Sequence, residues 1–221
     1  MRTQTKETQA KLTPQRAREI LLEGNQRFVN NLKVNRNLLQ QVNETSQNQY
    51  PFAIVLSCID SRTSAELIFD QGLGDIFSTR IAGNVVNEDI LGSMEFACKV
   101  AGSKLIVVLG HTNCGAIKGA CDNVQLGYLT GLVNKIKPSV DSIRYTGDKS
   151  SANSDFVERV AEANVRRMTD EIVAKSPILS DMIEKGEIGI VGGMYNIETG
   201  IVEFYEPAEK KNKLKHEEAA G

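Results

Sequence analysis

Two short, continuously apolar segments constrain the fold of this chain of 221 residues more than any other feature. They are Phe52–Ser57 and Lys104–Gly110, the second with Leu-Ile-Val-Val-Leu at its centre. Runs without polar alternation are typical of strands buried on both faces, as in parallel sheets. Both are far shorter than the roughly 20 apolar residues that a membrane-spanning helix needs. The chain is therefore expected to fold around a buried sheet.

Segments of strand character alternate with segments of helical character along the rest of the chain. Further strands are expected at Asp75–Ile81, Glu187–Val191 and Ile201–Tyr205, the last two as an antiparallel pair. Helices are expected at Ser64–Asp70, Glu88–Gly102, near Tyr128–Ile136 and over Ser151–Ser176. This alternation predicts an α/β fold with a mostly parallel mixed sheet, about four parallel strands and an antiparallel edge strand, flanked by helices.

The residues before the first apolar run differ in character from those that follow. The first twelve are polar and are expected to be loosely ordered. Thr13 and Pro14 are typical of an N-cap and a first helical residue, and the apolar spacing predicts an amphipathic helix over 14–31. We therefore divide the chain into an N-terminal helical arm (1–49), an α/β core (50–206) and a charged C-terminal tail (207–221).

The charge balance argues against several classes of partner. The 26 Lys and Arg residues against 28 Asp and Glu give a formal net charge of −2, which does not indicate nucleic acid or an acidic membrane as a partner. Four cysteines are too few for a disulfide scaffold. Met1–Pro14 lacks the apolar segment of a secretion signal, so the chain as given is expected in the cytoplasm, although a processed periplasmic form would look the same.

Polar clusters follow the two apolar runs directly. CIDSR (58–62) follows the first run, and HTNC (111–114) follows the second. The carboxyl ends of strands in an open parallel sheet share one crevice, where ligands bind. Two thiols and one imidazole that converge there, with a fourth position vacant, are the ligand pattern of catalytic zinc. The sequence thus predicts one zinc ion per chain, held in the core by Cys58, His111 and Cys114.

Each of these residues has a plainer explanation when it is taken alone. Asp60 or Ser61 could cap the following helix, and Cys58 could be a small core residue. A histidine and a cysteine three residues apart, as at His111 and Cys114, form a weak motif. The two clusters together favour the metal site. The other two cysteines are Cys98, expected on an apolar helix face, and Cys121, expected in a loop. Neither is expected to bind the metal.

The charged side chains beside Cys58 are suited to assist such a metal. A zinc ion with two thiolates is formally neutral and acidifies a bound water less than a three-histidine site does. Asp60 can accept the hydroxide proton and turn an oxygen lone pair toward substrate. Arg62 would keep the pKa of Asp60 low through a forked ion pair.

The segments CIDSR and HTNCGA, together with GLGDIFSTRIAGN (72–84), resemble the signatures of the β-class carbonic anhydrases over roughly residues 14–206. The resemblance implies a mostly parallel mixed sheet flanked by helices, with N-terminal helices that embrace a neighbouring subunit in a homodimer or tetramer. It also implies Cys58, His111 and Cys114 as the zinc ligands, and Asp60 with Arg62 as the catalytic dyad.

The resemblance further implies a substrate pocket. Gln49 matches a substrate-binding glutamine, and Phe77 and Phe96 match aromatic positions that line a narrow apolar pocket, although plain core packing would also explain both phenylalanines. Some members hold an inhibitory bicarbonate with a tryptophan, an arginine and a tyrosine. Arg80 and Tyr195 match the last two, but Val55 stands at the tryptophan position. We therefore expect the open form, in which Asp60 is not a zinc ligand.

The function expected from these residues is the reversible hydration of carbon dioxide to bicarbonate and a proton, catalysed by a carbonate dehydratase, which is a lyase. Three alternatives use the same residues differently. The first is a hydrolase of carbon disulfide or carbonyl sulfide on the same zinc site. The second is a zinc protein without turnover. The third is a thiol redox protein with Cys58 as nucleophile, although the chain has no Cys-x-x-Cys motif.

Overall fold

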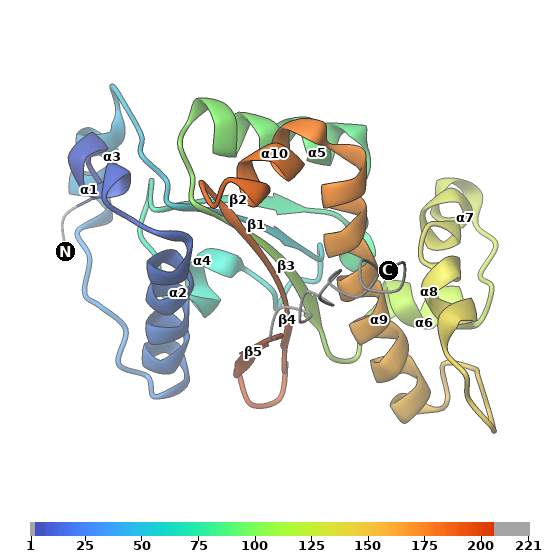
Figure 1. The fold of residues 1–221 in the computed structure, drawn as a ribbon. Coiled ribbons are helices and arrows are strands. Elements are labelled where there is room, and N and C mark those ends of the chain that lie inside the picture. The colour runs from blue at the N-terminus through green and yellow to red at the C-terminus, as the bar shows by residue number, and fades with distance from the viewer. Residues whose placement is uncertain (1–2, 206–221) are drawn as a thin grey trace, which may run out of the picture.

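A five-stranded sheet forms the centre of the molecule in the computed structural model, which describes residues 3–205 (Figure 1). Its strands are β1 (Ala53–Ser57), β2 (Ile76–Arg80), β3 (Leu105–His111), β4 (Gly189–Tyr195) and β5 (Val202–Phe204). They lie in the order β2-β1-β3-β4-β5; all neighbours are parallel except β4 and β5. The predicted α/β fold with four parallel strands and an antiparallel edge strand is confirmed. The predicted charged tail (207–221) lies outside the described residues.

Helices flank both faces of this sheet, and an N-terminal group precedes it (Figure 1). The N-terminal group is α1 (Lys6–Ala10), α2 (Pro14–Val29) and α3 (Leu38–Thr45). The others are α4 (Ala65–Ile68), the 3-10 turn η1 (Ala82–Asn84), α5 (Glu88–Glu95), the π-helical turn η2 (Phe96–Val100), α6 (Gly115–Cys121), α7 (Gly127–Asn134), α8 (Lys137–Ser142), α9 (Ser154–Lys175) and α10 (Pro177–Glu184). Within residues 3–205, no helix combines the length and apolar character needed to cross a bilayer.

The central strands are covered on both faces, which explains their uninterrupted apolar sequences. Every residue of β1 and β3 is buried. Because successive side chains of a strand point to opposite faces, each strand contributes to two cores. Ile54 and Leu56 pack in the core beneath α5, α9 and α10, whereas Ala53 and Val55 pack beneath α2 and α4. The sheet edge that carries the carboxyl ends of these strands is therefore held from both sides.

The long helix α9 lies very close to the sheet. A Cβ atom on Gly110 of β3 would meet Val165 of α9 at 2.6 Å, and a Cβ atom on Gly192 of β4 would meet Val165 at 2.8 Å. The absence of side chains at these two positions therefore provides a socket for Val165. We call this contact, made by Gly110, Gly192 and Val165, the glycine socket.

Helices with clear sequence signals lie near their expected positions, and several without such signals were not predicted. Asn153 caps α9, and Pro177 follows its end, as the expected helix over Ser151–Ser176 requires. In contrast, α6 falls in a segment that the sequence indicates as a polar connection. Two glycines weaken its helix propensity, and packing of Ile117 in the core outweighs that loss. Helices α1, α8 and α10 were also missed.

A carboxylate ties the N-terminal helices to the core. The Asp70 carboxylate, at the end of α4, is 4% exposed and accepts from Arg27 Nε at 2.6 Å and from Arg36 Nη1 at 2.5 Å. It also accepts from the Val34 amide at 3.2 Å. Burial raises the pKa of Asp70, but the two guanidinium groups outweigh burial and lower it below 3.8. Ala17 and Leu21 of α2 are fully buried in the core, so α2 is fixed by packing as well.

The Asp70→Asn variant is expected to unfold at lower urea concentration. Removing one partner of a buried ion pair leaves the other charge uncompensated, and the low end of the usual range predicts a loss of about 3 kcal/mol. Because the pKa of Asp70 is lowered in the fold, its stabilisation is present above the ordinary value of 3.8 and is lost as the pH falls below that value. The difference between parent and variant should therefore shrink on acidification.

A matched control is Asp181→Asn, which removes an exposed partner of Lys185. Exposed pairs contribute little, so this variant should unfold like the parent. If urea titration at neutral pH shows that the two substitutions lower the free energy of unfolding equally, Asp70 does not stabilise the fold in the way described.

Candidate metal centre

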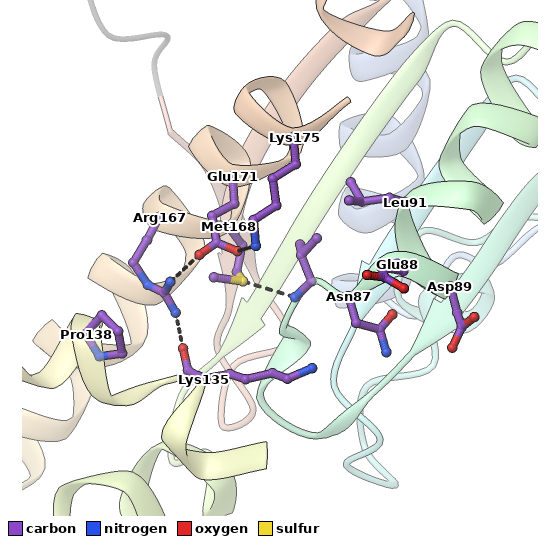
Figure 2. A pocket seen from close by; sticks show the side chains of 11 residues that line it. Asn87, Glu88, Asp89, Leu91, Lys135, Pro138, Arg167, Met168, Glu171 and Lys175 are labelled. Carbon is purple, nitrogen blue, oxygen red and sulfur yellow. Dashed lines mark hydrogen bonds and ion pairs between the residues drawn. The ribbon is translucent and has the colours of Figure 1, made fainter. Parts of the chain in front are cut away.

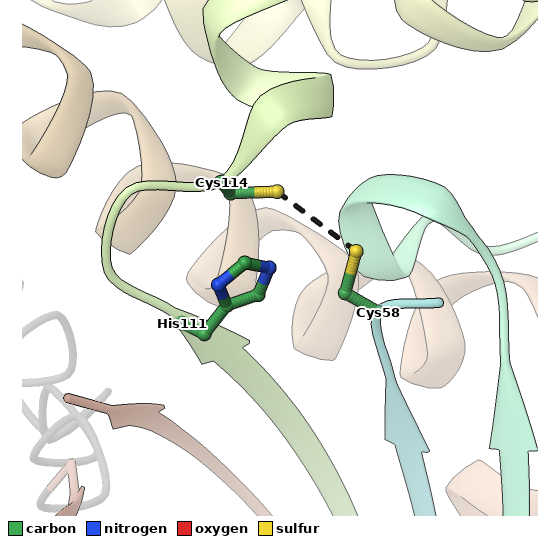
Figure 3. Close-up of side chains that lie close together, drawn as sticks. All are labelled: Cys58, His111 and Cys114. Atoms are coloured by element: carbon green, nitrogen blue, oxygen red, sulfur yellow. Dashed lines mark hydrogen bonds between the residues drawn. The ribbon is translucent and has the colours of Figure 1, made fainter. Parts of the chain in front are cut away.

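Two thiols and an imidazole meet at the carboxyl ends of β1 and β3. Cys58 follows β1 directly, His111 is the last residue of β3, and Cys114 precedes α6. Their ligand atoms all lie within 4.8 Å of one another, and the two sulfurs are 3.9 Å apart. All three side chains are buried and face a common point (Figure 3). The parallel pairing of Ser57 with Leu109 thus brings together Cys58 and His111, which are more than fifty positions apart in the sequence.

The imidazole is oriented as a metal ligand. His111 Nδ1 lies 2.9 Å from the carbonyl oxygen of Thr112, so this nitrogen carries the proton and donates. The other nitrogen, Nε2, is buried and has no hydrogen-bond partner within the described chain. Leaving such an atom unpaired costs about 1–3 kcal/mol, and a cation bound to its lone pair would remove that cost. The Cys₂His donor set therefore fits zinc with a fourth position open.

The two thiols share one proton in the absence of a cation. The hydrogen bond with Cys114 lowers the pKa of Cys58 to about 4, against the effect of burial, and His111 contributes in the same direction. The thiolate of Cys58, together with burial, raises the pKa of Cys114 above its ordinary value. One sulfur is therefore anionic at neutral pH, and a divalent cation would displace the proton from the other.

A forked ion pair stands beside the three ligands. Arg62 Nε donates to Asp60 Oδ1 at 2.9 Å, and Nη2 donates to Oδ2 at 2.7 Å. Arg62 holds the pKa of Asp60 well below its usual range, so the carboxylate stays ionised at neutral pH. Its Oδ2 lies 4.0 Å from His111 Nε2, close to the converging donors. Arg62 thus holds both carboxylate oxygens of Asp60.

Arg80 and Thr63 hold the loop between β1 and α4, a role that the sequence indicated for neither; Arg80 matched only a bicarbonate-holding arginine. Arg80, the last residue of β2, donates to the carbonyl of Cys58 at 3.0 Å and to that of Asp60 at 2.5 Å. Thr63 Oγ1 donates to the same carbonyls, each at 2.9 Å. On the other side, Glu158 accepts the amide proton of Asn113 at 2.7 Å. These contacts fix the ligands through backbone atoms, which leave no motif in the sequence.

The other predicted site residues lie elsewhere in the chain. Phe77 and Phe96 contact each other, with ring centroids 6.2 Å apart, and line a cavity of about 690 Å³ that includes none of the three ligands in its lining. Phe96 is 52% exposed. Gln49 is exposed in the loop before β1. Within one subunit, the structure therefore groups the ligands with Asp60 and Arg62 but does not join the three pocket residues to them.

Comparisons with known proteins give a consistent picture. The family model described as carbonic anhydrase matches residues 53–202. Carbonic anhydrase 2 of Mycobacterium tuberculosis is 37% identical over 195 residues, which cover 85% of this chain and 90% of that protein. Carbonic anhydrase of Mycolicibacterium smegmatis is 34% identical over 197 residues, covering 86% and 93%.

Solved structures agree with the fold. The β-carbonic anhydrase CafA of Aspergillus fumigatus superposes with a TM-score of 0.66 at 26% identity, covering 77% of this chain and 83% of that one. The β-carbonic anhydrase CcaA gives a TM-score of 0.67 at 25% identity, covering 86% and 95%.

The Cys114→Ala variant should lose its zinc. The remaining thiol and imidazole leave two protein ligands where catalytic zinc sites use three. Zinc per chain, measured by atomic emission after dialysis, is expected near one in the parent and near zero in the variant. Cys98→Ala is the matched control, because Cys98 is also buried but lies among apolar neighbours in η2. Retention of full zinc by Cys114→Ala would rule out this ligand set.

Proposed function

Because this chain belongs to the β-class carbonic anhydrase family, we propose that Cys58, His111 and Cys114 hold its zinc ion and that Asp60 and Arg62 assist the reaction. The protein is an enzyme that catalyses the reversible hydration of carbon dioxide to bicarbonate and a proton. The observation that carries the residue assignment is the convergence of two sulfurs and the unpartnered Nε2 of His111 beside an ionised carboxylate.

Cys58, His111 and Cys114 are suited to hold a zinc ion that activates water. When bound, zinc lowers the pKa of a water molecule and so supplies a nucleophile near neutral pH. The hydrogen bond between His111 Nδ1 and the Thr112 carbonyl keeps Nε2 available as a donor to the metal. Burial of Cys58 and Cys114 excludes competing water from the sulfurs.

Asp60 is proposed to orient the attacking water. Its Oδ2 accepts a proton of that water in a hydrogen bond, so that an oxygen lone pair is left to face carbon dioxide. The carboxylate can accept only while it is ionised, and the fork from Arg62 maintains that state. Arg62 itself is about half exposed, so its contribution is to hold Asp60 rather than to close the site.

Gln49, Phe77 and Phe96 are proposed to form the substrate pocket in an oligomer. Carbon dioxide is small and apolar, and the two phenylalanines offer an apolar wall, while the Gln49 amide can donate to one oxygen. In the single chain this wall is partly exposed at Phe96, and the N-terminal arm exposes further apolar side chains. These are Leu38, Leu39 and Val42. We propose that a second copy of the chain, in a homodimer or a tetramer, covers these surfaces and brings the pocket to the metal.

The Asp60→Asn variant should bind zinc normally and lose most of its activity. The amide cannot accept a proton with the strength of a carboxylate, and a positioned acid–base group typically contributes 10²–10⁴-fold, so we expect kcat/KM to fall about 10²-fold or more. Stopped-flow hydration of carbon dioxide and zinc content measure the two effects separately. Ser61→Ala, in the same loop, is the control and should retain activity. Undiminished hydration by Asp60→Asn would refute the assigned role.

The choice of substrate is tested directly by supplying different gases to the parent enzyme. Carbon dioxide should be hydrated rapidly, whereas carbonyl sulfide and carbon disulfide should release little hydrogen sulfide. Rapid release of sulfide with slow hydration of carbon dioxide would assign the site to the hydrolase reaction instead.

A further inference from the structure

The sulfur of Cys58 accepts a backbone hydrogen bond from the turn η1. The amide of Gly83 in η1 points at Cys58 Sγ over 3.4 Å. Gly83 has a φ of +67°, in the left-handed region that favours glycine. A Cβ atom there would lie 2.6 Å from Cδ1 of Ile136 and 3.2 Å from Cβ of Ala116. Any other residue at this position would therefore adopt an unfavourable φ and crowd Ile136 and Ala116.

A buried asparagine holds the other side of this turn. Asn164 of α9 is fully buried, at 0% exposure, and its Nδ2 donates to the carbonyl of Gly83 at 2.9 Å. Its Oδ1 accepts from the hydroxyl of Ser139 at 3.1 Å. Ser139, in α8, is itself buried. The asparagine thus uses its carbonyl and its amide to join three segments that are distant in sequence.

The chain of hydrogen bonds continues to a guanidinium. Arg167 Nε donates to Ser139 Oγ at 2.9 Å, while the same guanidinium pairs with Glu171 and donates to the Lys135 carbonyl. Arg167 lies in the wall of a cavity of about 590 Å³ between α5, α8 and α9 (Figure 2). With 24% of its side chain exposed, Arg167 is more exposed than the buried Ser139 and Asn164.

The four hydrogen bonds from Arg167 to Cys58 all run in the same direction from donor to acceptor. Arg167 donates to Ser139, Ser139 to Asn164, Asn164 to Gly83, and Gly83 to Cys58. Hydrogen bonds in series polarise one another in a low-dielectric interior. This polarisation runs from Arg167 as far as the Gly83 carbonyl. The Gly83 amide belongs to the preceding peptide group, so the last step to Cys58 depends on the position of the Gly83 backbone.

We propose that Asn164 is a positioning residue for the zinc ligand Cys58, acting through Gly83. It holds the turn so that the Gly83 amide remains on the sulfur, which fixes the thiolate and withdraws electron density from it. A thiolate that donates less charge leaves a bound cation more electrophilic. This inference rests on the proposed role of Cys58 as a ligand.

The test compares Asn164→Ala with Asn25→Ala in the holoenzyme. Asn25 is also buried and bonds to backbone atoms, namely the Ile68 and Gly200 carbonyls and the Val202 amide, but it lies in α2 on the opposite face of the sheet. Both variants lose a buried asparagine, so both should melt at lower temperature. Only Asn164→Ala should change the metal centre.

Two measurements report on the metal centre without using turnover. In the cobalt(II)-substituted enzyme, the sulfur-to-metal charge-transfer band should move to lower energy in Asn164→Ala, because the thiolate loses its hydrogen bond. Zinc affinity, measured by competition with a chelator, should fall about 10- to 100-fold, because Cys58 is no longer held in position for the metal and loss of outer-shell support usually costs that much. An unchanged band and unchanged affinity in Asn164→Ala would overturn the proposal, as would equal changes in Asn25→Ala.

Two further variants make the result decisive. Ser139→Ala removes one link of the series and leaves Asn164 in place, so it should shift the band in the same direction but less; if Asn164→Ala does not fold, an unchanged band in Ser139→Ala overturns the proposal. Cys58→Ala tests the premise. If Cys58→Ala loses zinc while Asn164→Ala resembles the parent, only this inference fails; if Cys58→Ala keeps zinc, the ligand assignment fails.

Discussion

The parallel pairing of β1 with β3 is the constraint on which the rest of the site depends. Parallel neighbours end at the same edge of the sheet, and the register of Ser57 with Leu109 places the residues that follow each strand side by side. Cys58 and His111 reach one point for this reason alone. The burial of both strands on both faces prevents either end from shifting, so a soft, polarisable donor set is held in a fixed place by an apolar framework.

The same arrangement creates an electrostatic problem that the polar residues resolve locally. Two thiols in a buried position cannot both ionise without a cation, and they share a proton instead. Asp60 adds a negative charge nearby, but the forked contact with Arg62 compensates it outside the ligand set. The donors therefore remain available to a divalent ion, and the carboxylate remains an acceptor beside them.

Sequence reasoning identified the parts of the molecule that are encoded locally. The buried strands, the N-cap of α2, and the two thiols with their imidazole could all be predicted, because each depends on neighbouring residues or on one fold rule. Arg80 and Asn164 could not, because they act on backbone carbonyls of residues far away in sequence. The roles of Gln49, Phe77 and Phe96 come from a family resemblance and remain predictions, since a single subunit does not bring them to the ligands.

The glycine socket has a consequence for the chemistry. Val165 seats in Gly110 and Gly192, and the next residue back along α9 is Asn164, whose side chain must reach the Gly83 carbonyl over 2.9 Å. A Cβ atom on either glycine would lie within 2.8 Å of a Val165 methyl group, so a side chain there would force α9 or Val165 to shift. Gly110 and Gly192 thus help to set the hydrogen bond between Asn164 and Gly83, although neither glycine takes part in it.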